Sequence, residues 1–338
     1  MSAPALAAAS GLALREDGTP VPDVLVFDLD RTVSDHRLDA LGPASVAFGV
    51  ADRPLSPAAQ RVARELACTL VPAGFERSAA EVGVADPRAA AEELVAAVHR
   101  SPRAAVTLAA LLRVVTQVPV RDGLAFESAA YSTLLAGVEF RAWLAGHPPP
   151  GPAVESGPAV RIERAGAELT IVLDRPRRRN AFGRAVRDGL VDAFDLVLGD
   201  PSIERVSLRG AGPAFCGGGD LAEFETSADV STAHLIRLDR SVADRIDRCQ
   251  ERVVAHVHGA CIGAGVEIPS FAGRIVARPD AFFQLPELQM GLLPGAGGTV
   301  GIARRIGRWR LAYLALTGRR LDIGGALDWG LVDAVDDG

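Results

Sequence analysis

The chain has 338 residues, enough for one large or two ordinary domains with a sizeable buried core. Apolar residues make up 49% and charged residues 23%, which excludes a wholly disordered chain. The net charge of −6 gives no basic face for a nucleic acid, and no apolar run is long enough to cross a membrane. Every basic residue in the Lys and Arg count is arginine, so chemistry that requires a lysine is excluded.

The start of the chain and the cysteines indicate the cellular compartment of the protein. Residues 1–22 are Ala-rich but lack the basic segment and long apolar core of a signal peptide, so we expect a flexible N-terminus. The four cysteines are scattered, without a CxxC pair or a metal-ligand spacing, which is typical of buried thiols in a reducing compartment. We therefore expect a cytoplasmic protein without a metal site.

The next part of the chain, residues 23–146, is rich in Ala and Leu. A strand is predicted at 24–29. Helical periodicity recurs in three stretches, 88–99, 104–115 and 126–135. We expect this region to be mainly helical. It is followed at 147–158 by three consecutive prolines and small residues, which predict an extended linker.

The remaining part, residues 159–338, alternates short strands, glycine-rich turns and helices. Strands are predicted at 168–173, 205–208, 253–257 and 274–277. Helices are predicted at 182–197, from 263 onward, and at 299–307. Strands that alternate with helices predict an α/β fold with parallel pairing.

Three stretches of this part carry candidate chemistry. They are 210–221 (GAGPAFCGGGDL), 258–268 (HGACIGAGVEI) and 283–299 (FQLPELQMGLLPGAGGT). The first two are glycine-dense turns after predicted strands, and glycine leaves backbone N–H groups open to close approach, so two such turns could direct two donors at one oxygen. Glu267 and Glu287 could act as acid and base beside them. Each feature alone is more often a simple turn or a solvated carboxylate.

Together with two further stretches, these elements resemble the crotonase family, the enoyl-CoA hydratases and isomerases. LDRPRRRNAF at 173–182 is similar to its opening R-P-x-x-x-N-A element, and LTGRRLDIGGALDWGLVDAV at 316–335 is similar to its L-T-G…G-L-V element. The chain departs from the family at His258, where Asn is usual, and at Ala264, where Gly is usual. The resemblance covers 165–335 and implies the crotonase-like ββα spiral.

The resemblance also implies roles for individual residues. The backbone N–H groups of Gly217 and Ala264 would form an oxyanion hole for the thioester oxygen, and Glu267 and Glu287 would be the catalytic pair. Arg177 would lie near the CoA phosphates, although an exposed basic patch is an equal alternative. The resemblance implies further substrate-binding positions within the stretch at 210–221: Ala214, Cys216, Gly218, Asp220 and Leu221. Candidates for the acyl pocket, each of which could simply be core, are Trp143, Phe215, Phe224 and Met290.

The implied activity is the addition of water to a 2-enoyl-CoA thioester. One glutamate would activate water for attack at C3 and the other would deliver a proton at C2. No cofactor is expected beyond the coenzyme A of the substrate, and the family implies a homotrimer or hexamer. The alternatives are an isomerase that needs one glutamate, an aryl-acetyl-CoA oxygenase, and a non-catalytic accessory subunit of the same fold.

The family's tail helices normally follow the G-L-V element, but here the chain stops at Gly338, a few residues beyond it. Stretches at 90–113 and 123–144 resemble those helices, and 24–41 faintly resembles 169–186. We therefore hypothesise a circular permutation in which residues 86–145 pack on the core at 160–338. Chain termini at surface loops tolerate such changes.

One rival interpretation concerns DLDRT at 28–32. A strand followed by D-x-D-x-T resembles the nucleophile loop of haloacid-dehalogenase-like phosphatases. That chemistry requires Mg²⁺, downstream acidic ligands and a basic residue that is usually Lys. The chain has no Lys, and no acidic pair follows before the linker, so we favour the crotonase interpretation.

Overall fold

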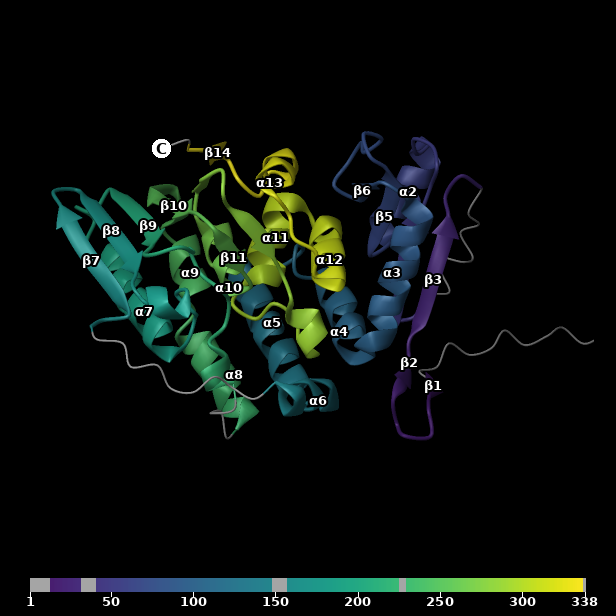
Figure 1. Ribbon diagram of the computed structural model, residues 1–338, viewed down its shortest axis with the longest axis horizontal. Helices are drawn as coiled ribbons and strands as arrows, with labels where there is room; N and C mark the ends of the chain where they lie inside the picture. The colour runs from purple at the N-terminus through teal and green to yellow at the C-terminus, as the bar shows by residue number, and fades with distance from the viewer. Residues whose placement is uncertain (1–12, 32–40, 148–156, 225–228, 337–338) are drawn as a thin grey trace, which may run out of the picture.

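The computed structural model describes residues 13–31, 41–147, 157–224 and 229–336. Two sheets lie at opposite ends of the molecule, and helices fill the space between them (Figure 1). The larger sheet belongs to the C-terminal part of the chain and the smaller one to the N-terminal part. The combination of helices and mainly parallel sheets confirms the α/β class expected from the sequence.

The larger sheet has six strands in the order β14-β12-β10-β9-β8-β7. In chain order these are β7 (Val160–Ala165), β8 (Glu168–Leu173), β9 (Arg205–Gly210), β10 (Val253–Val257), β12 (Arg274–Ala277) and β14 (Ala334–Val335). β7 and β8 form an antiparallel hairpin, and the other neighbouring pairs are parallel. Leu169, Ile171 and Leu173 are buried and alternate with less buried residues, so β8 turns one apolar face to the core.

Helices connect these strands and cover the sheet; α marks an α-helix and η a short 3-10 helix. Before β12 the chain forms η1 (Pro176–Arg178), α7 (Arg184–Gly199), η2 (Leu221–Glu223), α8 (Val230–Asp239), α9 (Val242–Asp247), η3 (Gln250–Arg252), α10 (Ala264–Glu267) and η4 (Pro269–Phe271). After β12 it forms η5 (Glu287–Met290), α11 (Gly298–Ile306), α12 (Arg308–Thr317) and α13 (Ile323–Trp329). A short parallel pair, β11 (Ala260–Ile262) and β13 (Phe282–Gln284), lies beside them. α7 buries one stripe, Val186, Leu190, Phe194 and Val197, at helical spacing.

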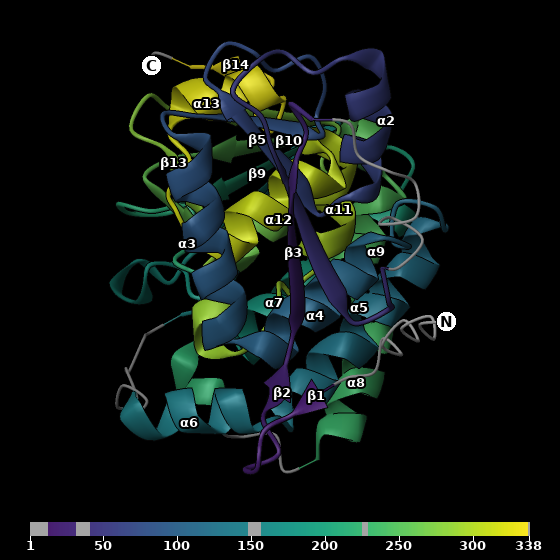
Figure 2. The ribbon, with the colours of Figure 1, turned by 90° about the vertical axis from the view of Figure 1, so that its right-hand side faces the viewer.

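The N-terminal part contains a second sheet of four parallel strands in sequential order. They are β3 (Asp23–Asp28), β4 (Ser45–Val50), β5 (Cys68–Pro72) and β6 (Glu81–Val84), with α2 (Pro57–Glu65) between β4 and β5. Four helices follow: α3 (Pro87–Arg100), α4 (Pro102–Leu112), α5 (Val120–Leu135) and α6 (Val138–Gly146). Figure 2 shows β3 at the outer surface, with the helices behind it.

The two parts share one hydrophobic core. Buried residues of the small sheet, including Phe48 and Leu70, belong to the same apolar cluster as Leu311 of α12. Polar contacts join the parts as well: Ser132 Oγ of α5 donates to Val230 O at 2.8 Å, and an ion pair joins Arg121 to Asp244 at 3.2 Å. Residues 86–145 therefore pack on the C-terminal core of the same chain, as the permutation hypothesis requires. The permutation itself remains a hypothesis about origin.

Three expectations for the N-terminal part need correction or limitation. Residues 13–21 were expected to be flexible, but β1 (Ala13–Leu14) and β2 (Pro20–Val21) pair in an antiparallel hairpin. The region at 23–146 is not built from helices and one strand alone, because three further strands lie within 45–84. All residues of β4 are buried, and a short apolar run without alternation cannot be told from a helix by its periodicity. Most of the Pro-rich stretch at 147–158 lies outside the described residues.

The carboxylates of the DLDRT stretch are bound by arginines of the N-terminal part. Asp28 pairs with Arg88 at 3.4 Å, and Asp30 pairs with Arg53 at 3.5 Å. Thr32 lies outside the described residues. Among the helices that the structure describes, none is both long and apolar enough to span a bilayer.

Candidate active site

The two glycine-rich turns of the C-terminal part meet side by side. Cys216 in the first turn forms a parallel bridge with Cys261 of β11. Cys216 N donates to Ala260 O at 3.3 Å, and Ile262 N donates to Cys216 O at 3.0 Å. A Cβ at Gly265 would lie 2.4 Å from Cys216 O, so only glycine permits this approach. Glycine at position 265 therefore allows the two turns to approach each other.

Asn180 holds the first turn in place. Its side chain is fully buried; Nδ2 donates to the carbonyl oxygens of Ala211, Ala214 and Phe215, while Oδ1 accepts from Arg175 N at 2.8 Å. Asn180 also adopts a positive φ of 54°, which asparagine tolerates better than most residues. The R-P-x-x-x-N-A element thus serves to shape the glycine turn. This role was not assigned from the sequence.

A cavity of about 610 Å³ opens between the turns and the helices of the N-terminal part. The predicted site residues that line it are Gly217, Gly218, Asp220, Leu221, Ala264, Glu267 and Glu287, joined by the acyl-pocket candidates Trp143, Phe224 and Met290. A cavity of this size, mostly apolar with a few convergent polar groups, is typical of a small-molecule site. The structure therefore brings most of the predicted residues together.

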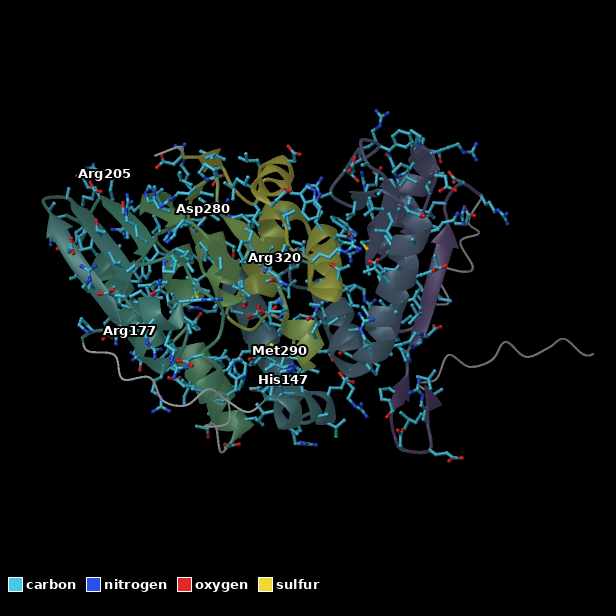
Figure 3. The ribbon with its side chains drawn as sticks, viewed as in Figure 1. His147, Arg177, Arg205, Asp280, Met290 and Arg320 are labelled. Atoms are coloured by element: carbon cyan, nitrogen blue, oxygen red, sulfur yellow. The ribbon has the colours of Figure 1, made fainter. Side chains whose placement is uncertain are left out.

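Four predicted residues lie elsewhere. Ala214, Phe215 and Cys216 are buried behind the turn and do not border the cavity, because their side chains pack into the core. Arg177 is exposed beside α7, well away from Met290 in Figure 3, and does not border the cavity either. Its neighbour Arg178 lines the cavity instead. Asp220 lines the cavity but also pairs with Arg175 at 3.0 Å, an ion pair that fixes the turn.

The prediction that Gly217 supplies an oxyanion-hole N–H is wrong. Gly217 N already donates to Arg179 O at 2.7 Å, so this group is not available to a ligand. Two residues later, Gly219 lies opposite Phe182 in a parallel bridge. Phe182 N donates to Gly218 O and Asp220 N donates to Phe182 O, whereas Gly219 N donates to no described residue. Ala264 N has no described acceptor either, and Ala264 does not have a positive φ. Gly219 and Ala264 therefore both border the cavity with an N–H group that no described residue accepts.

Glu267 is almost completely buried, and its carboxylate is held by main-chain amides. Oε2 accepts from Ala296 N at 2.7 Å and from Gly298 N at 2.9 Å, at the start of α11. Burial raises the pKa of Glu267 to about 7, while the two amide hydrogen bonds act in the opposite direction. At neutral pH, Glu267 can therefore be ionised and can accept a proton.

Glu287 lies beside Gly263, in an environment different from that of Glu267. A Cβ at Gly263 would lie 2.5 Å from Glu287 Oε1, and Gly263 has a positive φ of 50°, so glycine is required there. Glu287 Oε2 is buried and has no hydrogen-bond partner in the described structure. Burial, and then the negative charge of Glu267, raise the pKa of Glu287 well above its usual value. Glu287 therefore favours the protonated form.

A third buried carboxyl group, Glu127 of α5, was not identified from the sequence. Oε1 accepts from Gly297 N at 2.7 Å, and Oε2 accepts from Thr299 N at 2.9 Å and from Thr299 Oγ1 at 2.7 Å. The four consecutive amides at 296–299 therefore alternate between Glu267 and Glu127. Burial and then the charge of Glu267 raise the pKa of Glu127. In the sequence, this glutamate is distinguished only by its place in the stretch at 123–144 that resembles the family's tail helices, and its role cannot be inferred from that.

The N-terminal helices also supply aromatic walls. Tyr131 of α5 and Trp143 of α6 both line the cavity. The Trp143 ring stacks on His147 with ring centres 4.5 Å apart, and His147 and Met290 both appear in the lower part of the molecule in Figure 3. Among the described residues, no three His, Cys, Asp or Glu side chains gather as a metal ion would need.

Comparison with known proteins agrees with this geometry. A family model described as enoyl-CoA hydratase/isomerase matches residues 163–337. The enoyl-CoA isomerase/hydratase of Mycosarcoma maydis is 32% identical over 187 residues, covering 52% of this chain and 68% of that protein. The mitochondrial Delta(3,5)-Delta(2,4)-dienoyl-CoA isomerase of Mus musculus is 33% identical over 179 residues, covering 49% and 55%.

A solved structure gives the same result. The enoyl-CoA hydratase from Thermoplasma volcanium matches with a TM-score of 0.50 at 33% identity, over 54% of this chain and 73% of that chain. The match to the two curated relatives thus spans between 55% and 68% of their length. Since the family model covers more than half of the chain and the two glycine turns meet at one cavity, the protein belongs to the enoyl-CoA hydratase/isomerase family, within the crotonase superfamily.

Proposed function

We propose that this protein is an enoyl-CoA hydratase, which adds water across the 2,3 double bond of a 2-enoyl-CoA thioester. The observation that carries the proposal is the contrast between two carboxyl groups at one cavity. Glu267 accepts two amide hydrogen bonds, whereas Glu287 keeps a buried oxygen without a partner. Such a pair provides one base and one acid at the same pH.

The amides of Gly219 and Ala264 would bind the thioester oxygen. Negative charge grows on that oxygen as water attacks C3, so donors that are already in place stabilise the transition state more than the ground state. Removing one donor of this kind typically costs roughly 3 kcal/mol of transition-state stabilisation. This assignment replaces Gly217 by Gly219 and retains Ala264.

The proton balance gives each glutamate one role. Ionised Glu267 takes a proton from water while the water oxygen bonds to C3, and the π electrons move onto the thioester as an enolate. Protonated Glu287 then delivers its proton to C2, which completes the addition of one water. Glu267 ends protonated and Glu287 ends ionised, so one proton must return between them, or exchange with solvent, before the next turnover.

Incubation with crotonyl-CoA and longer 2-enoyl-CoA thioesters tests the proposal. The enoyl absorbance should fall and a 3-hydroxyacyl-CoA should form. A parallel incubation with 3-hexenoyl-CoA tests isomerase activity, which needs only one proton-transferring carboxyl group. Conversion of 3-hexenoyl-CoA to the 2-enoyl form, without any hydration of crotonyl-CoA, would refute the hydratase proposal in favour of an isomerase.

A further inference from the structure

A small second cavity of about 80 Å³ shares part of its lining with the main cavity. Both cavities are bordered by Phe182, Arg187, Arg237 and Gly295, so they lie on either side of the same wall. The second cavity exceeds the volume that one water takes in the liquid, about 30 Å³, and is large enough for a carboxylate group.

Arg237 of α8 lies at this junction, and no described carboxylate forms an ion pair with it. Its Nε donates to Ser128 Oγ at 3.0 Å, and its Nη2 donates to Ser128 O at 3.3 Å and to Ser132 Oγ. No carboxylate in the described structure pairs with Arg237, and its Nη1 donates to no described residue. Nearby arginines are paired; Arg245, for example, binds Asp195 at 2.7 Å.

The serines of α5 hold the Arg237 guanidinium in a fixed orientation but do not neutralise it. Its carbon atom also lies 5.0 Å from the centre of the Tyr131 ring. Burial lowers the pKa of Arg237, which reflects the cost of keeping this charge away from water. α5 and α8 lie side by side in Figures 1 and 2, so both helices build this position.

The surroundings add further positive charge. Arg187 and Arg240, which also border the small cavity, share one carboxylate, that of Asp188, at 2.9 Å and 2.8 Å. Asp192 is more distant from Arg240, at 3.5 Å, and largely exposed. Glu127 borders the same cavity, but burial raises its pKa and favours its neutral form. The small cavity is therefore an electropositive pocket.

Tyr131 links this pocket to the reacting carbons. Its ring packs directly on Gly295, where an added Cβ would lie 2.3 Å from a ring carbon. Burial raises the pKa of Tyr131, the charge of Arg237 lowers it, and the charges of Glu267 and Glu287 raise it further. Tyr131 is thus within electrostatic reach of the glutamates and of Arg237. Because Tyr131 and Arg237 line the same cavity as the two glutamates and lie next to each other, an acyl chain that extends beyond C3 along Tyr131 can reach the guanidinium.

We propose that the acyl group of the substrate ends in a carboxylate that Arg237 binds. The substrate class is then the coenzyme A monothioester of an unsaturated dicarboxylic acid. This inference rests on the proposed hydratase function for its kinetic test. Arginine suits the role because its planar guanidinium can donate two hydrogen bonds to one carboxylate.

The kinetic test compares 2-hexenoyl-CoA with its ω-carboxylate analogue, 2-hexenedioyl-CoA. The wild-type protein should prefer the carboxylate substrate in kcat/KM by roughly 10- to 100-fold, the range expected for a charge-assisted hydrogen bond. Arg237→Gln should abolish that preference. Arg245→Gln, which breaks a surface ion pair outside both cavities, should keep it. Equal kcat/KM for the two substrates in the wild-type protein would overturn the inference.

A binding test separates this inference from the hydratase proposal. Calorimetric titration compares hexanedioyl-CoA with hexanoyl-CoA, two saturated ligands that cannot be hydrated. Tighter binding of the first, lost in Arg237→Gln, supports the inference even if neither enoyl substrate reacts. If Arg237 instead contacts a phosphate of coenzyme A, the variant should weaken both ligands equally, and the inference fails. The wild-type comparison remains decisive if the variant does not fold.

Discussion

Substitution of Glu127 tests whether the N-terminal part of the chain shapes the active site. This carboxyl group accepts three hydrogen bonds from Gly297 and Thr299, between the two amides that hold Glu267. In Glu127→Gln, one oxygen remains as an acceptor and an NH₂ group replaces the other. One or two of the three donors then lose their acceptor inside the core.

The magnitude follows from the number of donors left without an acceptor. Each buried donor that loses its partner costs about 1–3 kcal/mol, so we expect Glu127→Gln to lose about 2–4 kcal/mol of stability. For a protein of this size, that corresponds to a melting temperature lower by roughly 3–6 °C. The variant also loosens the start of α11, where the amides of Ala296 and Gly298 lower the pKa of Glu267, so the apparent pKa of Glu267 should rise and the acid limb of the activity profile should shift to higher pH.

The assay is thermal unfolding together with kcat and KM for crotonyl-CoA as a function of pH. Glu81→Gln is the matched control, because Glu81 is equally buried and accepts from Ser78 Oγ at 2.9 Å, in the small sheet. It should lose stability without a shift of the pH profile. If Glu127→Gln unfolds at the wild-type temperature with an unchanged profile, Glu127 does not support the start of α11.

Three further predictions concern titration and the two glycine turns. Activity should rise as the pH increases through about 7, where Glu267 becomes ionised. Thermal stability should fall as the pH rises from about 4.5 to about 7 and then level off, because burial raises the folded-state pKa of Glu267 and the group favours the folded form only while its proton is bound. A flat activity profile around neutral pH would contradict this. Gly265→Ala should separate the turns and abolish crotonyl-CoA hydration, since its Cβ would lie 2.4 Å from Cys216 O. The control Gly199→Ala, with open space around it, should have little effect. Retained hydration in Gly265→Ala would argue against the convergence of the turns. Asn180→Ala should lose about 3 kcal/mol of stability in urea unfolding, because three carbonyl oxygens and Arg175 N lose their partner; a loss below about 1 kcal/mol would mean that Asn180 does not shape the turn.

The strands of the C-terminal half and their pairing could largely be predicted from the sequence, because these elements are short, regular and closely spaced. β8 and β12 have the predicted bounds, and the parallel pairing of β8, β9, β10 and β12 follows from their alternation with helices. The convergence of the two glycine turns was also expected. In that half, the sequence pattern and the tertiary structure agree.

The choice of Gly217 shows where sequence reasoning fails. Three consecutive glycines offer three amides, and only the tertiary contact of Gly217 N with Arg179 O decides which are open. The sequence likewise could not place Arg237 or Glu127, because their roles depend on α5 packing against α8 and α11. The strand at 45–50 was missed since a fully buried strand lacks the alternation that marks a half-buried one.

The most direct measurement of the central claim is the rate of crotonyl-CoA hydration by Glu267→Gln and Glu287→Gln. Both variants keep the side-chain size and remove one proton-transferring group, so unfolding temperature and binding of a saturated acyl-CoA serve as controls. General acid–base catalysis contributes typically 10²–10⁴-fold, so each variant should lose at least roughly 100-fold in kcat while still folding and binding the ligand. A folded variant of either residue that retains wild-type turnover would contradict the two-glutamate mechanism.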